Sequence, residues 1–168
     1  MALWRLYYHF VWSTKGRLPM ITPEIEQELY GYIIGKADAL ECITHAIGGI
    51  EDHIHLIESV PPKLAVAEFV QKIKGSSSHH VNYGMPEAAT KLYWQRGYGV
   101  FSLGAKNLER AIAYVCNQKE HHRKQQIIAA LERDSEEDDG PAPYNEGKAI
   151  ASIRTMAIDA PNMAFNTK

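Results

Sequence analysis

Two histidines one residue apart are the first side chains of this sequence that could do chemistry. They lie in the segment Asp52-His53-Ile54-His55-Leu56, which has the alternation of a strand. Successive side chains of a strand point to opposite faces, so His53 and His55 share one face. Two imidazoles on one face can ligate a divalent metal. An isolated pair of this kind is more often structural, so a second group is needed to indicate a site.

A tyrosine and several polar side chains form such a second group, on a helix predicted over residues 108–131. At about 100° per residue, Tyr114, Gln118 and His121 fall on one narrow stripe of this helix. His122 falls toward the apolar side and ranks below His121, although either imidazole could contact a metal or a phosphate. Without the histidine strand, the stripe is better explained by a partly buried tyrosine with solvated neighbours.

Together, the two groups fit the cleavage of a phosphodiester by a tyrosine hydroxyl with the help of a metal ion. In this hypothesis Tyr114 attacks the phosphate and forms a phosphotyrosine, while the metal ligands are His53, His55 and Gln118. Oxygen ligands suit Mg²⁺ or Mn²⁺, and two imidazoles favour Mn²⁺. Mg²⁺ is expected in the cell because it is abundant. The ester conserves the energy of the broken bond, so a free 3′-hydroxyl can later reverse the step.

The elements that must bring this strand and this helix together follow from hydrophobic periodicity. Alternation predicts a strand over residues 3–14, with His9 on the face opposite to Phe10 and Trp12. Thr22, before a proline and a glutamate, is typical of a helix start. Further strands are predicted over 42–50, 53–60 and 92–103, and a further helix over 65–73, ending before the polar stretch 76–80. This order predicts an α+β, ferredoxin-like (RRM-like) antiparallel sheet with helices on one face, plus a C-terminal helix that carries the tyrosine.

Charge is unevenly distributed along the chain. Residues 1–131 hold 14 Lys and Arg against 12 Asp and Glu, whereas residues 132–168 hold 4 against 8. We therefore expect one domain over residues 1–131, on which a nucleic-acid surface is permitted, and an acidic, partly ordered C-terminal tail over residues 132–168. The two cysteines form no C-x-x-C pair, and no stretch is long and apolar enough for a membrane helix. These features predict a cytoplasmic protein without a membrane partner.

Basic and aromatic residues near the ends of the predicted elements are candidates for contact with DNA. Cations there could bind phosphates, and a tyrosine ring could stack on an unpaired base, while Trp94 is expected in the core. The alternative is that the exposed cations are simply solvated. The DNA-binding candidates are Lys15, Arg17, Lys74, Arg96 and Tyr98.

Several segments between residue 3 and about residue 125 match one family in order and spacing. They are Tyr8-His9-Phe10-Val11-Trp12 with Lys15-Gly16-Arg17, Asp52-His53-Ile54-His55, Trp94-Gln95-Arg96-Gly97-Tyr98-Gly99, Phe101-Ser102, and Tyr114-Val115 followed by Asn117-Gln118 and His121-His122. This set resembles the single-tyrosine HUH transposases of small bacterial insertion sequences. Those of the 200/605 type and the REP-associated tyrosine transposases are both included in that resemblance.

The resemblance implies a fold, a reaction and a substrate. The implied fold is a ferredoxin-like sheet in a homodimer. The implied reaction is cleavage by Tyr114 through a 5′-phosphotyrosine, with a metal held by the two histidines and the glutamine. Single-stranded DNA with hairpins near the ends of a mobile element is the implied substrate. After His122 this chain departs from many relatives, which continue with a Thr-Phe-x-x-Glu segment and further tyrosines.

Two other functions remain open at this point. The chain could be a domesticated relative that cuts palindromes of its host genome, or a nucleic-acid-binding module without catalysis on the same fold. Flanking genomic palindromes would separate the two cutters, and a covalent adduct with DNA would separate a cutter from a binder. The sequence also leaves open whether Tyr114 acts with the metal of its own subunit or of a partner.

Overall fold

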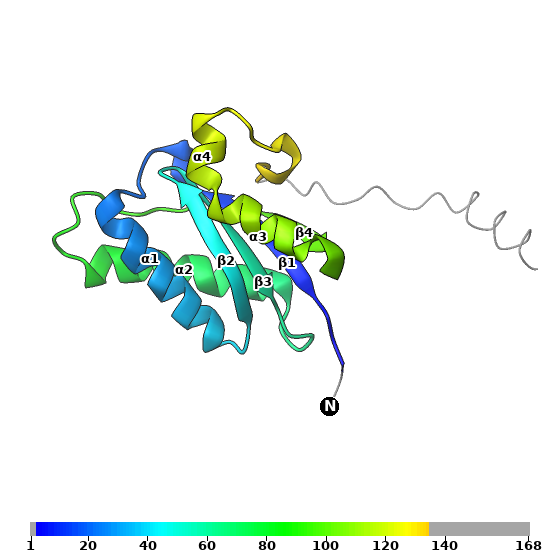
Figure 1. Cartoon of the computed structure of the whole chain (residues 1–168). Helices are drawn as coiled ribbons and strands as arrows, with labels where there is room; N and C mark the ends of the chain where they lie inside the picture. The colour runs from blue at the N-terminus through cyan, green and yellow to red at the C-terminus, as the bar shows by residue number, and fades with distance from the viewer. Residues whose placement is uncertain (1–2, 135–168) are drawn as a thin grey trace, which may run out of the picture. The chain divides into compact units, whose positions relative to one another are not determined.

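The computed structural model describes residues 3–134, which form a four-stranded sheet with helices packed against it (Figure 1). The strands are β1 (Tyr7–Ser13), β2 (Ile43–Ile50), β3 (His53–Ser59) and β4 (Gly99–Leu103). All neighbouring strands are antiparallel, in the order β2-β3-β1-β4. The predicted α+β, ferredoxin-like fold is therefore confirmed.

One face of the sheet is covered by α1 (Pro23–Asp38) and α2 (Val66–Gly84), which enclose the main hydrophobic core. Phe10 and Trp12 alternate onto this face from β1 and are fully buried, as predicted. Each large apolar side chain buried in this way contributes about 1.5–3 kcal/mol. Other fully buried members of this core include Ile25, Leu29, Ile33, Ile54, Leu56, Phe69 and Ile73.

The opposite face carries α3 (Leu108–Cys116), which packs on β2 and β3 over a smaller apolar cluster. The buried residues of this cluster are Ala46, Ile57, Tyr114 and Val115. Gly48 of β2 permits the close approach of the helix, because a Cβ at this position would lie 2.2 Å from the backbone oxygen of Val115. The close packing of α3 on the sheet fixes Tyr114 above β3.

The prediction of a single long helix over residues 108–131 is wrong. α3 ends just before Asn117, whose φ of −105° and ψ of 21° are not helical, and α4 (Gln118–Arg123) is a separate helix. The side-chain amide of Asn117 donates to the backbone oxygen of Ala113 at the end of α3. Beyond α4 the chain turns at Gln125, whose φ is 54°. The residues that follow include the 3-10 helix η3 (Ala129–Leu131), and they fold back over the sheet.

Three other predicted boundaries differ from the structure by more than one residue. β1 begins at Tyr7 rather than at residue 3. α2 continues through the polar stretch 76–80, where the serine hydroxyls donate to backbone oxygens of the preceding turn. β4 begins only at Gly99, and Trp94 forms an isolated bridge with Thr14 instead. These differences do not alter the topology.

The predicted acidic tail over residues 132–168 is described only at its start. Glu132 and Asp134 both contact the rest of the described chain, while residues 135–168 lie outside the described residues. Within residues 3–134, no helix combines the length and the apolar character that a membrane span requires.

Candidate active site

Three histidines lie together on the face of the sheet opposite to the main core. His53 and His55 reach this face from β3, as predicted, and His9 reaches it from β1. Nε2 of His9 is hydrogen-bonded to Nδ1 of His55 at 2.8 Å, and Nδ1 of His53 is hydrogen-bonded to Asp52 at 2.5 Å. Because both Nδ1 atoms are engaged, the Nε2 atoms of His53 and His55 are left to bind another group. All three side chains are fully buried.

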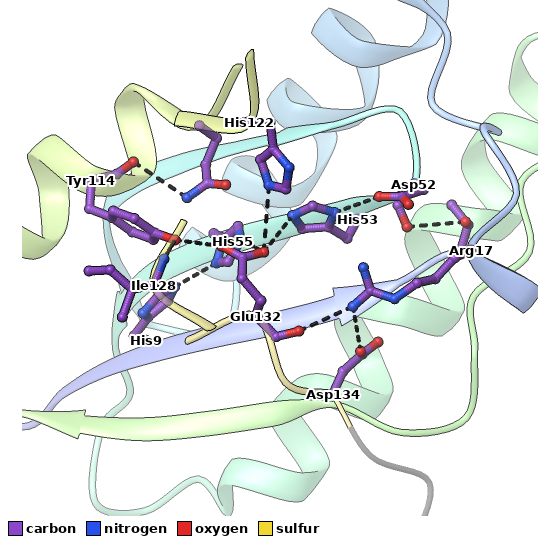
Figure 2. Close-up of polar contacts among 12 residues, drawn as sticks. His9, Arg17, Asp52, His53, His55, Tyr114, His122, Ile128, Glu132 and Asp134 are labelled. Atoms are coloured by element: carbon purple, nitrogen blue, oxygen red, sulfur yellow. Dashed lines mark hydrogen bonds and ion pairs between the residues drawn. The ribbon is translucent and has the colours of Figure 1, made fainter. Parts of the chain in front are cut away.

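Tyr114 lies beside these imidazoles. Its ring centroid is 6.0 Å from that of His55 and 6.4 Å from that of His9. The phenol donates a hydrogen bond of 2.5 Å to Oε1 of Glu132, and the backbone N–H of Ile128 donates to the phenol oxygen at 3.1 Å (Figure 2). The structure thus brings together, within one chain, the tyrosine and the histidine strand singled out in the sequence.

Gln118, the first residue of α4, is buried next to Tyr114. Its amide nitrogen donates to the backbone oxygen of Tyr114 at 3.5 Å, whereas its Oε1 has no hydrogen-bond partner among residues 3–134. An unpaired buried oxygen is costly unless it binds another group, and amide oxygens are ligands of hard divalent cations. Gln118 therefore fits a role as metal ligand.

The two histidines of α4 point to different neighbours. His122 packs on His53 with ring centroids 4.9 Å apart, whereas His121 stacks on the ring of Tyr114 at 4.9 Å. The sequence ranked His121 above His122, but His122 is the one that lies among the possible metal ligands. His121 thus keeps the side of Tyr114 that the helical spacing predicted, whereas the neighbouring His122 faces the histidine strand.

The carboxylate of Glu132 is the point on which these groups converge (Figure 2). Its Oε2 lies 3.1 Å from Nε2 of His53, 3.3 Å from Nε2 of His55 and 3.6 Å from Nε2 of His122. The contact with His53 has the distance of an ion pair without the alignment of a hydrogen bond. His53, His122 and Glu132 have ligand atoms within 4.8 Å of one another, so this group could hold a metal ion.

Two residues of this site were not identified from the sequence. Glu132 opens an acidic stretch, and no local pattern sets it apart from its neighbours. The position of His9 could be found from the alternation of β1, which puts it on the face away from Phe10 and Trp12. Its contact with His55 depends on the register of β1 against β3, which the sequence does not encode locally.

Burial and pairing shift the pKa values of the three histidines in different directions. Burial and the neighbouring His55 lower the pKa of His9 to about 3, and burial also lowers the pKa of His55. Burial alone would lower the pKa of His53, but its contacts with Asp52 and Glu132 outweigh this effect and raise the pKa. His9 and His55 are thus neutral imidazoles, and neutral imidazole is the form that binds metals.

Tyr114 and Glu132 influence each other through their hydrogen bond. Burial and the Glu132 carboxylate raise the pKa of Tyr114, so the phenol keeps its proton in this arrangement. Burial would raise the pKa of Glu132, but contacts with His53, His55 and Tyr114 outweigh it and hold that pKa far below its usual range. Glu132 is therefore a partly buried anion that is satisfied by the groups of the site.

Four of the five predicted DNA-binding residues line one hollow of about 640 Å³. The hollow lies between α2 and residues 93–98. The ammonium group of Lys74 also donates to the backbone oxygens of Gln95 at 2.6 Å and Gly97 at 2.7 Å, so this lysine fixes the loop. The four residues are Lys15, Lys74, Arg96 and Tyr98.

Arg17, the fifth candidate, does not line this hollow, although it ends the 3-10 helix η1 (Lys15–Arg17) that begins with Lys15. Its guanidinium group donates to the backbone oxygen of Glu132 at 3.1 Å and to the carboxylate of Asp134 at 2.9 Å (Figure 2). Contact of any of the five residues with DNA stays a prediction.

The chain is similar in sequence to known transposases. Residues 2–118 match the model of the family described as IS200-like transposases. The chain is 26% identical over 122 residues to the ISDra2 transposase TnpA of Deinococcus radiodurans. The aligned residues make up 69% of this chain and 86% of the relative. It is 29% identical over 129 residues to the transposase for insertion sequence element IS200 of Salmonella typhimurium, covering 71% of this chain and 81% of the relative.

The fold is also similar to that of a solved transposase. A REP-associated tyrosine transposase bound to a REP hairpin matches with a TM-score of 0.54 and 15% sequence identity, over 76% of each chain. At this identity the likeness concerns the fold alone. Since the family model spans more than half of the sequence, the chain belongs to the family of IS200-like transposases.

Proposed function

We propose that this transposase cleaves and rejoins single-stranded DNA, with Tyr114 as the nucleophile and His53, His55 and Gln118 as the ligands of a divalent metal. The observation that carries the proposal is that one carboxylate, that of Glu132, contacts both groups. Oε1 accepts the hydrogen bond of the phenol, and Oε2 lies within 3.3 Å of Nε2 of both strand histidines. A nucleophile and metal ligands that reach one carboxylate are close enough to act on one phosphate.

Cleavage would be a displacement at the scissile phosphate. The phenol oxygen of Tyr114 forms a bond to phosphorus, the bond from phosphorus to the 3′-oxygen breaks, and the phenol proton ends on the leaving 3′-hydroxyl. The products are a 5′-phosphotyrosine and a free 3′-hydroxyl, so the step balances without another reactant. A 3′-hydroxyl can then attack the phosphotyrosine and rejoin the strands without ATP.

The surroundings of the histidines support their role as metal ligands. Asp52 and His9 engage Nδ1 of His53 and His55, which orients both Nε2 atoms toward one point. Gln118 adds a buried oxygen that has no partner in the described part of the chain. A bound Mg²⁺ or Mn²⁺ ion would polarise a phosphate oxygen and offset the charge that develops during attack. Two imidazoles tilt this donor set toward Mn²⁺.

The proposed substrate is single-stranded DNA with a hairpin near the cleaved bond. A protein of similar fold was solved with a REP hairpin, and the hollow lined by Lys15, Lys74, Arg96 and Tyr98 offers cations and a ring on one surface. A homodimer belongs to the same proposal and is tested by light scattering after size-exclusion chromatography. The contacts of Tyr114 with the histidines of its own chain favour cleavage in cis.

The decisive test is the covalent adduct. The protein is incubated with labelled single-stranded DNA and Mn²⁺ or Mg²⁺, and a protein–DNA adduct is sought on a denaturing gel. We expect the adduct with the wild type, none after chelation of the metal, and none with Tyr114→Phe, while DNA binding by Tyr114→Phe is retained. Tyr83→Phe is the matched control, since this tyrosine of α2 is exposed and far more accessible than Tyr114.

Each failure of this test points to a different alternative. An adduct that persists in Tyr114→Phe would mean that another residue is the nucleophile. DNA binding by the wild type without any adduct would favour the non-catalytic binding module. Strand transfer that occurs only with palindromes of the host genome would favour the domesticated relative.

A further inference from the structure

Residues 125–134 form a segment, named the strap, that returns from the end of α4 across the active site. The strap engages the phenol of Tyr114 both as a hydrogen-bond donor and as an acceptor. Glu132 accepts the hydrogen of the phenol at 2.5 Å, and the backbone N–H of Ile128 donates to its oxygen at 3.1 Å. With these two bonds in place, the phenol oxygen is occupied and cannot approach a phosphorus atom.

The groups beneath the strap are closed off from solvent. His53 and His55 are 0% exposed, and Gln118 is 1% exposed. A phosphodiester of a DNA strand is bulky and hydrated, so it can reach these side chains only if the covering residues move away. The arrangement is therefore a closed state of the site.

Glu132 has the chemistry of the group that the site is expected to bind. A carboxylate and a phosphodiester are both anions that offer two equivalent oxygens as hydrogen-bond acceptors. One oxygen of Glu132 faces Tyr114, and the other faces Nε2 of His53, His55 and His122 (Figure 2). A scissile phosphate would need the same two contacts, one with the nucleophile and one with the metal-binding side.

Polar anchors hold the strap to the sheet. Arg17 donates to the backbone oxygen of Glu132 and forms an ion pair with Asp134. Gly99 of β4 leaves room for the strap, because a Cβ at this position would lie 2.2 Å from the backbone oxygen of Arg133. These anchors fix the position of the Glu132 carboxylate.

Apolar burial contributes little to this attachment. Leu131 packs against the small cluster below α3, whereas Ile127 and Ile128 are 43% and 41% exposed. Opening the strap would therefore cost polar contacts that a DNA phosphate can replace, and little hydrophobic burial. A segment of this kind can open locally while the main core stays folded.

We propose that the strap keeps the transposase self-inhibited, with the Glu132 carboxylate in the place of the scissile phosphate, so that DNA must displace it before cleavage. The inference rests on the proposed function, since it takes Tyr114 as the nucleophile. It makes Glu132 a competitor of the substrate, and loss of its carboxylate accelerates the first step.

The test compares the initial rate of adduct formation in the wild type, in Glu132→Ala and in Asp134→Asn, with labelled single-stranded DNA and Mn²⁺. Glu132→Ala removes the competing carboxylate, and we expect a rate about tenfold higher. Asp134→Asn weakens the anchor at Arg17 without changing a side chain of the site, and we expect a rise of about two- to fivefold. Amide hydrogen exchange of residues 125–134 should become faster in both variants.

Glu109→Ala is the matched control, because it removes an exposed acidic side chain from the first turn of α3. Its adduct rate and its strap exchange should equal those of the wild type. A rate in Glu132→Ala that is no higher than that of the wild type overturns the inference, because Glu132 then assists cleavage or does not compete with phosphate. An adduct that persists in the double variant Glu132→Ala, Tyr114→Phe contradicts the proposed function instead.

Discussion

The two faces of the sheet have opposite chemistry, although the same strands build both. In β3, Ile54 and Leu56 enter the main core, whereas His53 and His55, each one residue away, are buried on the other face. The apolar side chains gain free energy from burial, while buried imidazoles cost free energy unless each is paired. The free energy gained in the main core must therefore offset the cost of burying the imidazoles on the polar face.

This contrast predicts that substitutions on the two faces have separable effects. On the core face, truncation should reduce the free energy of unfolding. On the polar face, truncation should remove the reaction and leave the fold largely intact, because a buried imidazole contributes less stability than an apolar side chain of similar size. Four substitutions test the separation.

His53→Ala should have the largest effect, and only on the reaction. Loss of this metal ligand is expected to lower the rate of adduct formation by about 10⁴-fold, which is ~5.5 kcal/mol of transition-state stabilisation. Binding of Mn²⁺ measured by calorimetry should weaken in parallel, while the urea midpoint changes little. An unfolding midpoint as low as that of a core variant would contradict the division between the two faces.

Phe69→Ala should have the converse effect. Phe69 of α2 is fully buried against Phe10, with ring centroids 5.2 Å apart. Its truncation leaves a cavity in the main core and should lower the free energy of unfolding by about 3–5 kcal/mol. Ile34→Ala on the exposed side of α1 is the control, expected to cost less than about 1 kcal/mol. The adduct rate of folded Phe69→Ala protein should stay near that of the wild type.

Glu58 is a polar residue buried in β3 that lies outside the active site. It accepts a hydrogen bond from Thr44 at 2.8 Å, and burial raises its pKa from 4.5 to about 8. Between these two pH values the folded state keeps the Glu58 proton while the unfolded state loses it. The contribution of Glu58 to the free energy of unfolding is therefore full below about pH 4.5 and is lost as pH rises toward about 8. The nearby Cys42 does not titrate in this range, because burial and Glu58 raise its pKa to about 12.

Glu58→Gln should remove this pH dependence. The variant keeps the size of the side chain, so its free energy of unfolding relative to the wild type should rise by a few kcal/mol between about pH 5 and about pH 8. Urea denaturation at a series of pH values measures the difference. Parallel pH profiles of the two proteins would show that Glu58 is ionised in the folded state.

The division of side chains between the two faces of the sheet can be predicted from the sequence, because strand alternation is a local pattern. The positions of Phe10 and Trp12 on one face, and of His53 and His55 on the other, follow from a period of two that burial enforces. The sequence also makes Tyr114 a candidate to lie near a histidine strand, since an amphipathic helix after a ferredoxin-like unit can cover the remaining face of the sheet, but it does not tell whether that strand belongs to the same subunit.

The strap could not be predicted in the same way. Apolar residues continue beyond Arg123 at Ile127, Ile128 and Leu131, so a helical pattern extends past the point where α4 ends. The position of the strap on the sheet is held by contacts with distant residues, such as Arg17 with Glu132, which are 115 positions apart. Long-range pairing of this kind leaves no periodic signal in the sequence.

Gly48→Ala tests the close packing of α3 on the polar face of the sheet. Gly48 pairs with His55 in the ladder of β2 and β3, and an added Cβ would lie 2.2 Å from the backbone oxygen of Val115, next to the nucleophile. The helix must shift, which should cost about 1–3 kcal/mol of stability and lower the adduct rate by about ten- to a hundredfold, because Tyr114 is displaced. Gly104→Ala is the matched control, since a Cβ there meets nothing within 4 Å and the backbone φ is −75°. Normal adduct formation by Gly48→Ala would mean that cleavage tolerates movement of α3, and that the site is assembled only when DNA binds.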